Sequence, residues 1–190
     1  MVRKYDSSRR RKAADYTREE ILRAALKLHW QGITGFEPLA REAGWSVATL
    51  RKHFPSKEAL FRGCTHAFAE TLTLPDLAAL AAIGDAAQRL EHCVAELCRI
   101  HEAQFGYAWL GAQQRSESPT LDAVMEGYDG LIDAIAAIVT PPGSARAPLI
   151  RSLLDYLTYR ALRLSGQLAP DDAARELVAA LRPLTLETQP

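Results

Sequence analysis

The sequence predicts an all-α fold, and three observations support that fold class. Apolar side chains recur three and four positions apart in most segments between glycine and proline residues, which is the spacing of one helix face. Ala and Leu are abundant while aromatic residues make up 7% of the chain, a composition that favours helices over strands. No segment alternates polar and apolar residues, so no strand is predicted.

The N-terminal end predicts a basic arm followed by a first helix. Residues 1–15 are polar and basic and show no helical periodicity, so we expect a flexible arm. This arm could serve solubility alone or contact a polyanion such as a nucleic-acid backbone. Thr17 and Glu20 form a capping box that opens an amphipathic helix, and Gly32 ends it.

Three more helices are predicted before residue 70. Thr34 is expected to cap a short helix that stops at Gly44. Ser46 caps another short helix that runs to about His53. Ser56 follows a proline and caps the next helix.

The rest of the chain predicts further helices with one clear loop. Apolar stripes indicate helices at about 85–103 and 119–139, and a segment rich in proline and glycine at 140–148 indicates a loop. Two more stripes predict the last helices, at about 148–165 and 170–182.

Charge divides the chain into two parts of opposite sign. Residues 1–62 hold 14 Lys/Arg against 7 Asp/Glu, and residues 63–190 hold the other 9 against 16. We therefore expect two domains, residues 16–62 and 63–190, of which the first meets a polyanion, either nucleic acid or a membrane surface. Three cysteines and no apolar run of about 20 residues predict a soluble, cytoplasmic protein without disulfides.

The segment 34–53 has the sequence form of a helix-turn-helix. Two short helices flank a tight turn at Gly44, and the second starts at a serine cap. Leu50 and Phe54 face inward, so the other side chains of that helix face outward and could enter a DNA major groove. Shape alone is a weak signal, because any helical bundle joins short helices through glycine turns.

Residues 17–62 resemble the DNA-binding domain of TetR-family regulators. The stretches that carry the resemblance are Ile21-Leu22-Arg23-Ala24-Ala25, Leu39-Ala40-Arg41-Glu42-Ala43-Gly44, Ala48-Thr49-Leu50 and His53-Phe54-Pro55-Ser56-Lys57-Glu58-Ala59-Leu60. The resemblance implies a recognition helix starting at Ser46, phosphate contacts from Thr34 and Thr49, and a backbone contact from Lys57. It also implies that the last two helices form a dimer and that the middle helices enclose a ligand pocket.

The sequence and the resemblance together predict three sets of site residues. DNA-binding residues are expected at Thr34, Ser46, Val47, Ala48, Thr49, Arg51, Lys52, His53 and Lys57. Ligand-binding residues are expected at His101, Trp109, Tyr128 and Tyr156. The dimer interface is expected at Ile150, Leu153, Leu154, Leu157, Ala161, Leu177, Val178 and Leu181. Three departures from the family bear on the operator sequence. Arg51 stands where Tyr is usual, and Trp45 replaces a smaller turn residue. The connection Gly32–Thr34 is also about two residues shorter than is common, and Pro38 lies in the first turn of the next helix.

The expected function is a homodimeric transcriptional repressor that binds a near-palindromic DNA operator and is released by a small-molecule effector. We expect no enzyme, no cofactor and no membrane partner, because catalytic and phosphate-binding signatures are absent from the sequence. His92, Cys93, Cys98 and His101 cannot converge from one helix, so no metal site is predicted. The alternative is a helical small-molecule or redox sensor whose basic N-terminus contacts a partner other than DNA.

Overall fold

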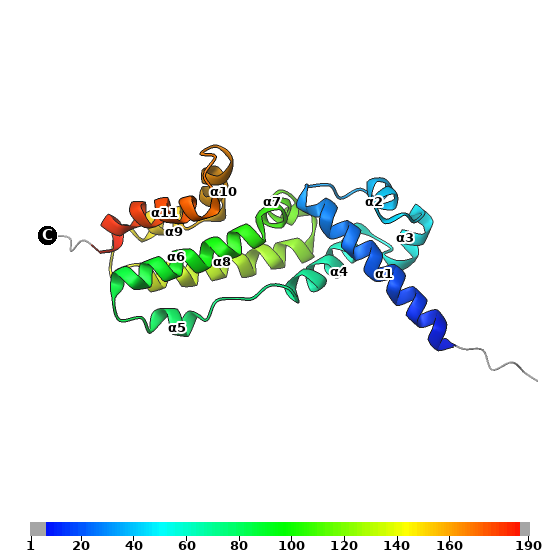
Figure 1. Ribbon diagram of the computed structural model, residues 1–190, viewed down its shortest axis with the longest axis horizontal. Helices are drawn as coiled ribbons and strands as arrows, with labels where there is room; N and C mark the ends of the chain where they lie inside the picture. Colours follow the sequence, from blue (N-terminus) through cyan, green and yellow to red (C-terminus); the bar gives the residue numbers. More distant parts are fainter. Residues whose placement is uncertain (1–6, 187–190) are drawn as a thin grey trace, which may run out of the picture. The chain divides into compact units, whose positions relative to one another are not determined.

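A computed structural model describes residues 7–186, and all regular secondary structure in that range is helical (Figure 1). The elements are α1 (Ser7–Trp30), α2 (Phe36–Ala43), α3 (Val47–His53), α4 (Lys57–Ala69), α5 (Leu77–Ala81), α6 (Ala86–Ala103), α7 (Phe105–Gln114), a 3-10 turn (Arg115–Glu117), α8 (Pro119–Val139), α9 (Ala147–Leu153), α10 (Tyr156–Leu164) and α11 (Pro170–Thr185). The all-α prediction is confirmed. None of these helices combines the length and apolar character that a bilayer span requires.

The chain forms two compact units whose boundary differs from the predicted one at 62/63. The first unit contains Met1–Thr71 and Trp109–Asp122, and the second contains Leu72–Ala108 and Ala123–Pro190. The first unit gains the second segment because Phe61 on α4 is buried together with Leu110 and Leu121. A long-range cluster of this kind leaves no periodic signal that sequence analysis could detect.

The core of the first unit is built by the apolar faces of α1 to α4. Its buried side chains are Ile21, Ala24, Ala25, Leu28, Phe36, Leu39, Leu50, Phe54, Leu60 and Cys64. Gly63 lies where α4 crosses α1, and a Cβ there would stand 2.8 Å from the Phe54 ring. The close crossing therefore depends on the missing side chain.

The predicted arm and capping box at the N-terminal end are wrong over the described residues. Helix α1 begins at Ser7, so residues 7–15 are helical, and residues 1–6 lie outside the described residues. Thr17 lies inside this helix, where its hydroxyl donates to the Ala13 carbonyl oxygen at 3.0 Å. Arg, Lys and Ala are strong helix formers, so the helix continues past the polar residue that was expected to start it.

The predicted caps of the next three helices have mixed outcomes. Gly35, not Thr34, is the N-cap of α2. Ser46 caps α3 and Ser56 caps α4, each accepting from a backbone amide at 3.1 Å as predicted. Gly44 ends α2 with φ +70°, a left-handed conformation that glycine adopts without strain.

The second unit is organised by α11 packing along α6, with α5 and α10 also against α6. Leu177 and Leu181 are the buried anchors of α11, and Leu90, Val94 and Leu97 are those of α6. Arg182 on α11 and Glu91 on α6 form an ion pair at 2.8 Å beside this contact. The apolar stripes of α6 and α11 that the sequence predicts are thus buried between the two helices of this unit.

The helix predicted over 148–165 is two helices, α9 and α10, separated at Leu154 and Asp155. The Asp155 carboxylate accepts from the Leu157 amide at 2.8 Å and so caps α10. The Leu154 carbonyl accepts from the imidazole Nε2 of His101 at 3.0 Å. Periodicity missed the break because the apolar stripe runs through it.

Candidate nucleic-acid interface

Helices α2 and α3 form a helix-turn-helix with a three-residue turn, Gly44–Ser46. The left-handed Gly44 reverses the chain, and the backbone amide of Trp45 still bonds the Ala40 carbonyl at 3.1 Å. The Ser46 hydroxyl accepts from the Thr49 amide and also lies 2.9 Å from the Thr49 hydroxyl. Local interactions therefore determine both the turn and the first turn of α3.

The inward face of α3 is anchored in the core of the first unit. Leu50 is fully buried and Phe54, which follows the helix, is 1% exposed. Arg18 on α1 holds the end of α3 from outside, because its Nη1 donates to the His53 carbonyl at 3.3 Å. Its guanidinium also lies 4.3 Å from the Phe54 ring centroid. Both attachments restrict how α3 can rotate about its axis.

The outward face of α3 is open to solvent and cationic. Ala48, Arg51 and Lys52 are exposed, and Val47, Thr49 and His53 are partly exposed. A helix of this width fits the major groove of B-DNA, which is about 12 Å wide. The small Ala48 allows close approach of the backbone, and the cations match the phosphates and guanine edges of the groove.

Arg51 is oriented by an aromatic side chain from the preceding helix. Its guanidinium lies 5.0 Å from the ring centroid of Phe36, which is itself buried. Stacking on an aromatic face leaves the in-plane N–H donors of guanidinium available for bidentate bonds. The contact therefore holds the Arg51 side chain against the surface while its N–H groups stay available to bond a base or a phosphate.

Two predicted phosphate-contact residues lie outside the recognition helix. Thr34 is partly exposed in the connection before α2. Lys57 is exposed at the start of α4, where its amine lies 3.5 Å from the side-chain oxygen of Gln114 and 5.7 Å from the Phe61 ring centroid. A phosphate contact by Lys57 would compete with the Gln114 contact.

Glu58 is a functional candidate that the sequence analysis missed. Its carboxylate accepts from the Ser118 hydroxyl at 2.6 Å, from the Thr120 amide at 3.0 Å and from the Thr120 hydroxyl. These hydrogen bonds lower the pKa of Glu58. The carboxylate thus joins the first turn of α4 to the first turn of α8, which continues into the second unit. Sixty residues separate the partners in sequence, so no local pattern signals the link.

In the second unit, three of the four predicted ligand residues lie together. His101 is 1% exposed, and its ring centroid lies 5.7 Å from that of Tyr128 and 6.2 Å from that of Tyr156. Phe105 and Tyr159 complete the aromatic cluster, and neither is among the predicted ligand residues. Trp109 is different, because it belongs to the first unit. This cluster of His101, Phe105, Tyr128, Tyr156 and Tyr159 is called the aromatic cluster below.

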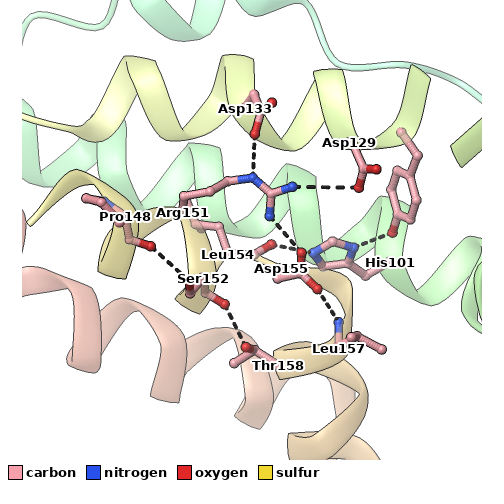
Figure 2. A network of polar contacts seen from close by, with 11 residues as sticks. His101, Asp129, Asp133, Pro148, Arg151, Ser152, Leu154, Asp155, Leu157 and Thr158 are labelled. Atoms are coloured by element: carbon pink, nitrogen blue, oxygen red, sulfur yellow. Dashed lines mark hydrogen bonds and ion pairs between the residues drawn. The ribbon is translucent and has the colours of Figure 1, made fainter. Parts of the chain in front are cut away.

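Hydrogen bonds fix the tautomer of His101 (Figure 2). A carbonyl oxygen can only accept, so Nε2 carries the proton and donates to Leu154. Nδ1 is then the acceptor for the Tyr128 hydroxyl. Burial lowers the pKa of His101 to about 4, so the ring is neutral at pH 7.

Arg151 holds the same region together from three sides (Figure 2). It donates to Asp155 at 2.7 Å and to Asp133, and it lies 3.7 Å from Asp129. Asp129 and Asp133 are on α8, whereas Asp155 caps α10. The cation therefore ties the α9–α10 break to α8.

The four residues considered as metal ligands lie in different environments. His92 is exposed, whereas Cys93, Cys98 and His101 are buried. Burial raises the pKa of Cys93 to about 11 and that of Cys98 to about 12. Both thiols are therefore protonated at pH 7, which is the unreactive form.

The predicted dimer residues divide into two groups. Ile150, Leu154, Leu177 and Leu181 are at most 3% exposed within one protomer, so they offer little surface to a dimer partner. They fill the core because α9 and α11 pack against neighbours of the same chain. Leu157 is 55% exposed and Ala161 is exposed, while Leu153 and Val178 are partly exposed.

The chain was compared with known proteins. The family model described as bacterial regulatory proteins, tetR family, matches residues 21–64. No curated protein sequence matches the chain significantly. A TetR-like transcriptional regulator from Rhodococcus sp. RHA1 is 21% identical with a TM-score of 0.62, over 90% of this chain and 97% of that chain.

Two further solved structures have names that describe a regulatory or binding role. NalD, the secondary repressor of the MexAB-OprM multidrug efflux pump in Pseudomonas aeruginosa, is 19% identical with a TM-score of 0.56, over 93% of this chain and 100% of that chain. The multidrug binding protein EbrR, complexed with imidazole, is 22% identical with a TM-score of 0.50, over 100% of this chain and 96% of that chain. At these identities the likeness establishes the fold.

An exposed cationic helix in a helix-turn-helix, joined to a second helical unit, is typical of DNA-binding regulators of transcription. The family match covers the helix-turn-helix and the helices on either side of it. Residues 21–64 therefore match the DNA-binding domain of the tetR family of bacterial regulatory proteins, and the whole chain has the fold of TetR-like regulators.

Proposed function

We propose that this protein is a homodimeric repressor that places α3 in the major groove of a near-palindromic operator and is released by a small molecule. The observation that carries the proposal is the surface of α3, where Arg51 and Lys52 are exposed while Leu50 is buried beneath them. Two recognition helices related by twofold symmetry match half-sites about 34 Å apart or somewhat more.

The dimer contact is assigned to the exposed apolar face of α10. Leu157, Ala161 and Leu164 are spaced four and three positions apart, so they share one face, and Leu157 and Leu164 are 55% and 54% exposed. A twofold axis would bring this face against its own copy, as an isologous interface requires. Val178 and the partly exposed Leu153 add apolar surface on the adjoining helices.

The effector site is assigned to the aromatic cluster of the second unit. Ligand pockets combine apolar walls with a few placed polar groups. The hydroxyls of Tyr128, Tyr156 and Tyr159 are such groups, and an effector would replace the hydrogen bonds that they now make within the unit. NalD is an efflux-pump repressor and EbrR a multidrug binding protein, and these descriptions support a small organic molecule as the effector class.

Release follows if the effector binds better to a protomer arrangement that does not fit the operator. A ligand shifts such an equilibrium only by its differential affinity for the two arrangements. Glu58 is a candidate for carrying the change, because it bonds the first turn of α8 while next to the DNA-contact candidate Lys57.

The first experiment selects a preferred duplex from a randomised library and compares Arg51→Ala with the matched control Arg175→Ala. Arg175 is an exposed arginine on α11 and forms an ion pair with Asp172. Loss of a bidentate base contact removes about 1–3 kcal/mol of discrimination, so Arg51→Ala should lose about 5- to 150-fold in preference for the selected duplex. Fluorescence anisotropy measures both variants, and Arg175→Ala should retain the preference.

Two results would overturn this proposal. If Arg51→Ala keeps the affinity and preference of the wild type, Arg51 does not read bases. If the wild-type protein retains no duplex even at low salt, its basic end meets a partner other than DNA, as in a helical sensor.

A further inference from the structure

We infer that the N-terminal part of α1, residues 8–16, is a second DNA-binding element that contacts phosphates flanking the operator and becomes firmly helical when it does so. This inference rests on the proposed function, because it requires α3 to lie in the major groove. It assigns a role to a cationic segment that lies outside the helix-turn-helix and before the segment matched by the family model.

Helix α1 is longer than the part of it that packs in its domain. The helix has 24 residues, but its buried residues begin only at Ile21. All residues from 8 to 16 are exposed. At 1.5 Å per residue, this segment projects about 13 Å beyond the part of α1 that packs in the core, and Figure 1 shows it extending past the other helices of its unit.

The exposed segment of α1 is strongly cationic. Arg9, Arg10, Arg11 and Lys12 are consecutive, and Asp15 is the one acidic residue in this exposed segment. The first turn of α1 contains no acidic side chain. Cations at a helix N-terminus oppose the helix dipole, each by about 0.3–1 kcal/mol at low ionic strength. A helical segment without burial has little to offset this, so neutralisation by phosphates would stabilise its helical state.

The segment starts next to the recognition helix. Arg18 contacts the C-terminal end of α3 through the His53 carbonyl and the Phe54 ring. Residues 8–16 therefore leave the domain beside the end of the recognition helix. With α3 in the major groove, a rod about 13 Å long from this point reaches the sugar-phosphate backbone that borders the groove.

The helical register identifies which cation faces the DNA. Arg11 precedes Arg18 by seven residues, so the two side chains leave the helix within about 20° of each other. Arg11 thus lies on the same side of α1 as the α3 contact. Arg9 is two residues from Arg11, so it points about 160° away. The chain therefore offers a matched control with the same residue type, charge and helix.

The experiment measures the salt dependence of duplex binding for full-length wild type, Arg11→Gln and Arg9→Gln. One phosphate contact contributes about 0.9 to the slope of log affinity against log salt. The ratio of wild-type to Arg11→Gln affinity should therefore fall by about threefold between 50 and 200 mM salt. The loss should be the same on the selected duplex and on an unrelated one, because phosphates carry no sequence information. Arg9→Gln should stay within experimental error of the wild type.

Hydrogen exchange of the same proteins tests the ordering. The selected duplex should slow amide exchange in residues 8–16 of the wild type, and less so in Arg11→Gln. Equal salt slopes for Arg11→Gln and Arg9→Gln, or unchanged exchange on adding duplex, would overturn the inference while leaving the proposed function intact. A wild type that binds no duplex would overturn the proposed function itself. Tighter binding to vesicles containing phosphatidylserine than to duplex would show that the partner of this segment is a membrane surface and not DNA.

Discussion

Two buried histidines link the stability of this protein to pH. His29 is 3% exposed in the first unit, where its ring lies 5.4 Å from that of Phe61, and His101 is 1% exposed in the aromatic cluster. Burial lowers the pKa of each ring to about 4, and nearby Lys57 adds to the effect on His29. Both histidines are therefore neutral in the folded protein over a range in which an unfolded chain would protonate them.

We expect the free energy of unfolding to fall as pH drops from about 6.5 to about 4. In this window the unfolded chain binds protons that the folded protein does not, so each histidine removes about 3 kcal/mol by the end of it. Above pH 6.5 both rings are neutral in the folded and in the unfolded chain, so the two histidines no longer make stability depend on pH. Urea unfolding at several pH values from 7.5 to 4.5 measures how the free energy of unfolding changes with pH. His29→Leu should reduce this slope by the contribution of one proton. Parallel curves for His29→Leu and wild type would contradict the assignment.

At the scale of elements, the break between α9 and α10 depends on side chains rather than on glycine or proline. Leu154 gives its carbonyl to His101, and Asp155 caps the amide of Leu157. Arg151 then holds the Asp155 carboxylate in the capping position. The break changes the direction of the chain between two helices that sequence periodicity joins into one, and so determines which face of α10 is exposed.

Asp155→Ala should lower the free energy of unfolding by about 1–2 kcal/mol, because it removes an N-cap and one ion pair. Asp133→Ala provides the control, since Asp133 pairs with the same Arg151 but its side chain is 65% exposed and caps no helix. Exposed pairs contribute less than about 1 kcal/mol, so this variant should be affected less. Urea unfolding at pH 7 compares them, and equal losses would show that the cap contributes nothing.

At the scale of the whole molecule, assembly depends on the apolar surface that each protomer leaves uncovered. Leu157 and Leu164 remain more than half exposed on α10, whereas Ile150 and Leu177 are buried in the core. Exposed apolar side chains on one helix face are typical of a surface that a partner covers. In the proposed homodimer, a twofold axis would place this face against its own copy.

Leu157→Glu should convert the dimer to monomers in sedimentation velocity, because the symmetric contact would bury two glutamates per dimer. The control is Leu74→Glu, which adds the same charge at another leucine, 63% exposed and outside the helices. It should sediment as the wild type does. A dimer that survives Leu157→Glu would place the contact elsewhere on the surface.

The sequence by itself determined most of the helices and the helix-turn-helix, because these depend on interactions between residues a few positions apart. The serine cap of α3, the glycine after α2 and the spacing of Leu50 and Phe54 are all local features. The cationic face of α3 follows directly from that register. The end of α8 at Val139 was predicted for the same reason.

Only the tertiary structure decided which apolar side chains fill the core and which remain for a partner. Periodicity shows that Leu154 and Leu157 are apolar helical positions, but burial of one and exposure of the other depend on packing against distant helices. The meeting of His101 with Tyr128 and of Glu58 with Ser118 also joins residues far apart in sequence. Such contacts form between elements, so they depend on how the chain packs rather than on any pattern within one segment.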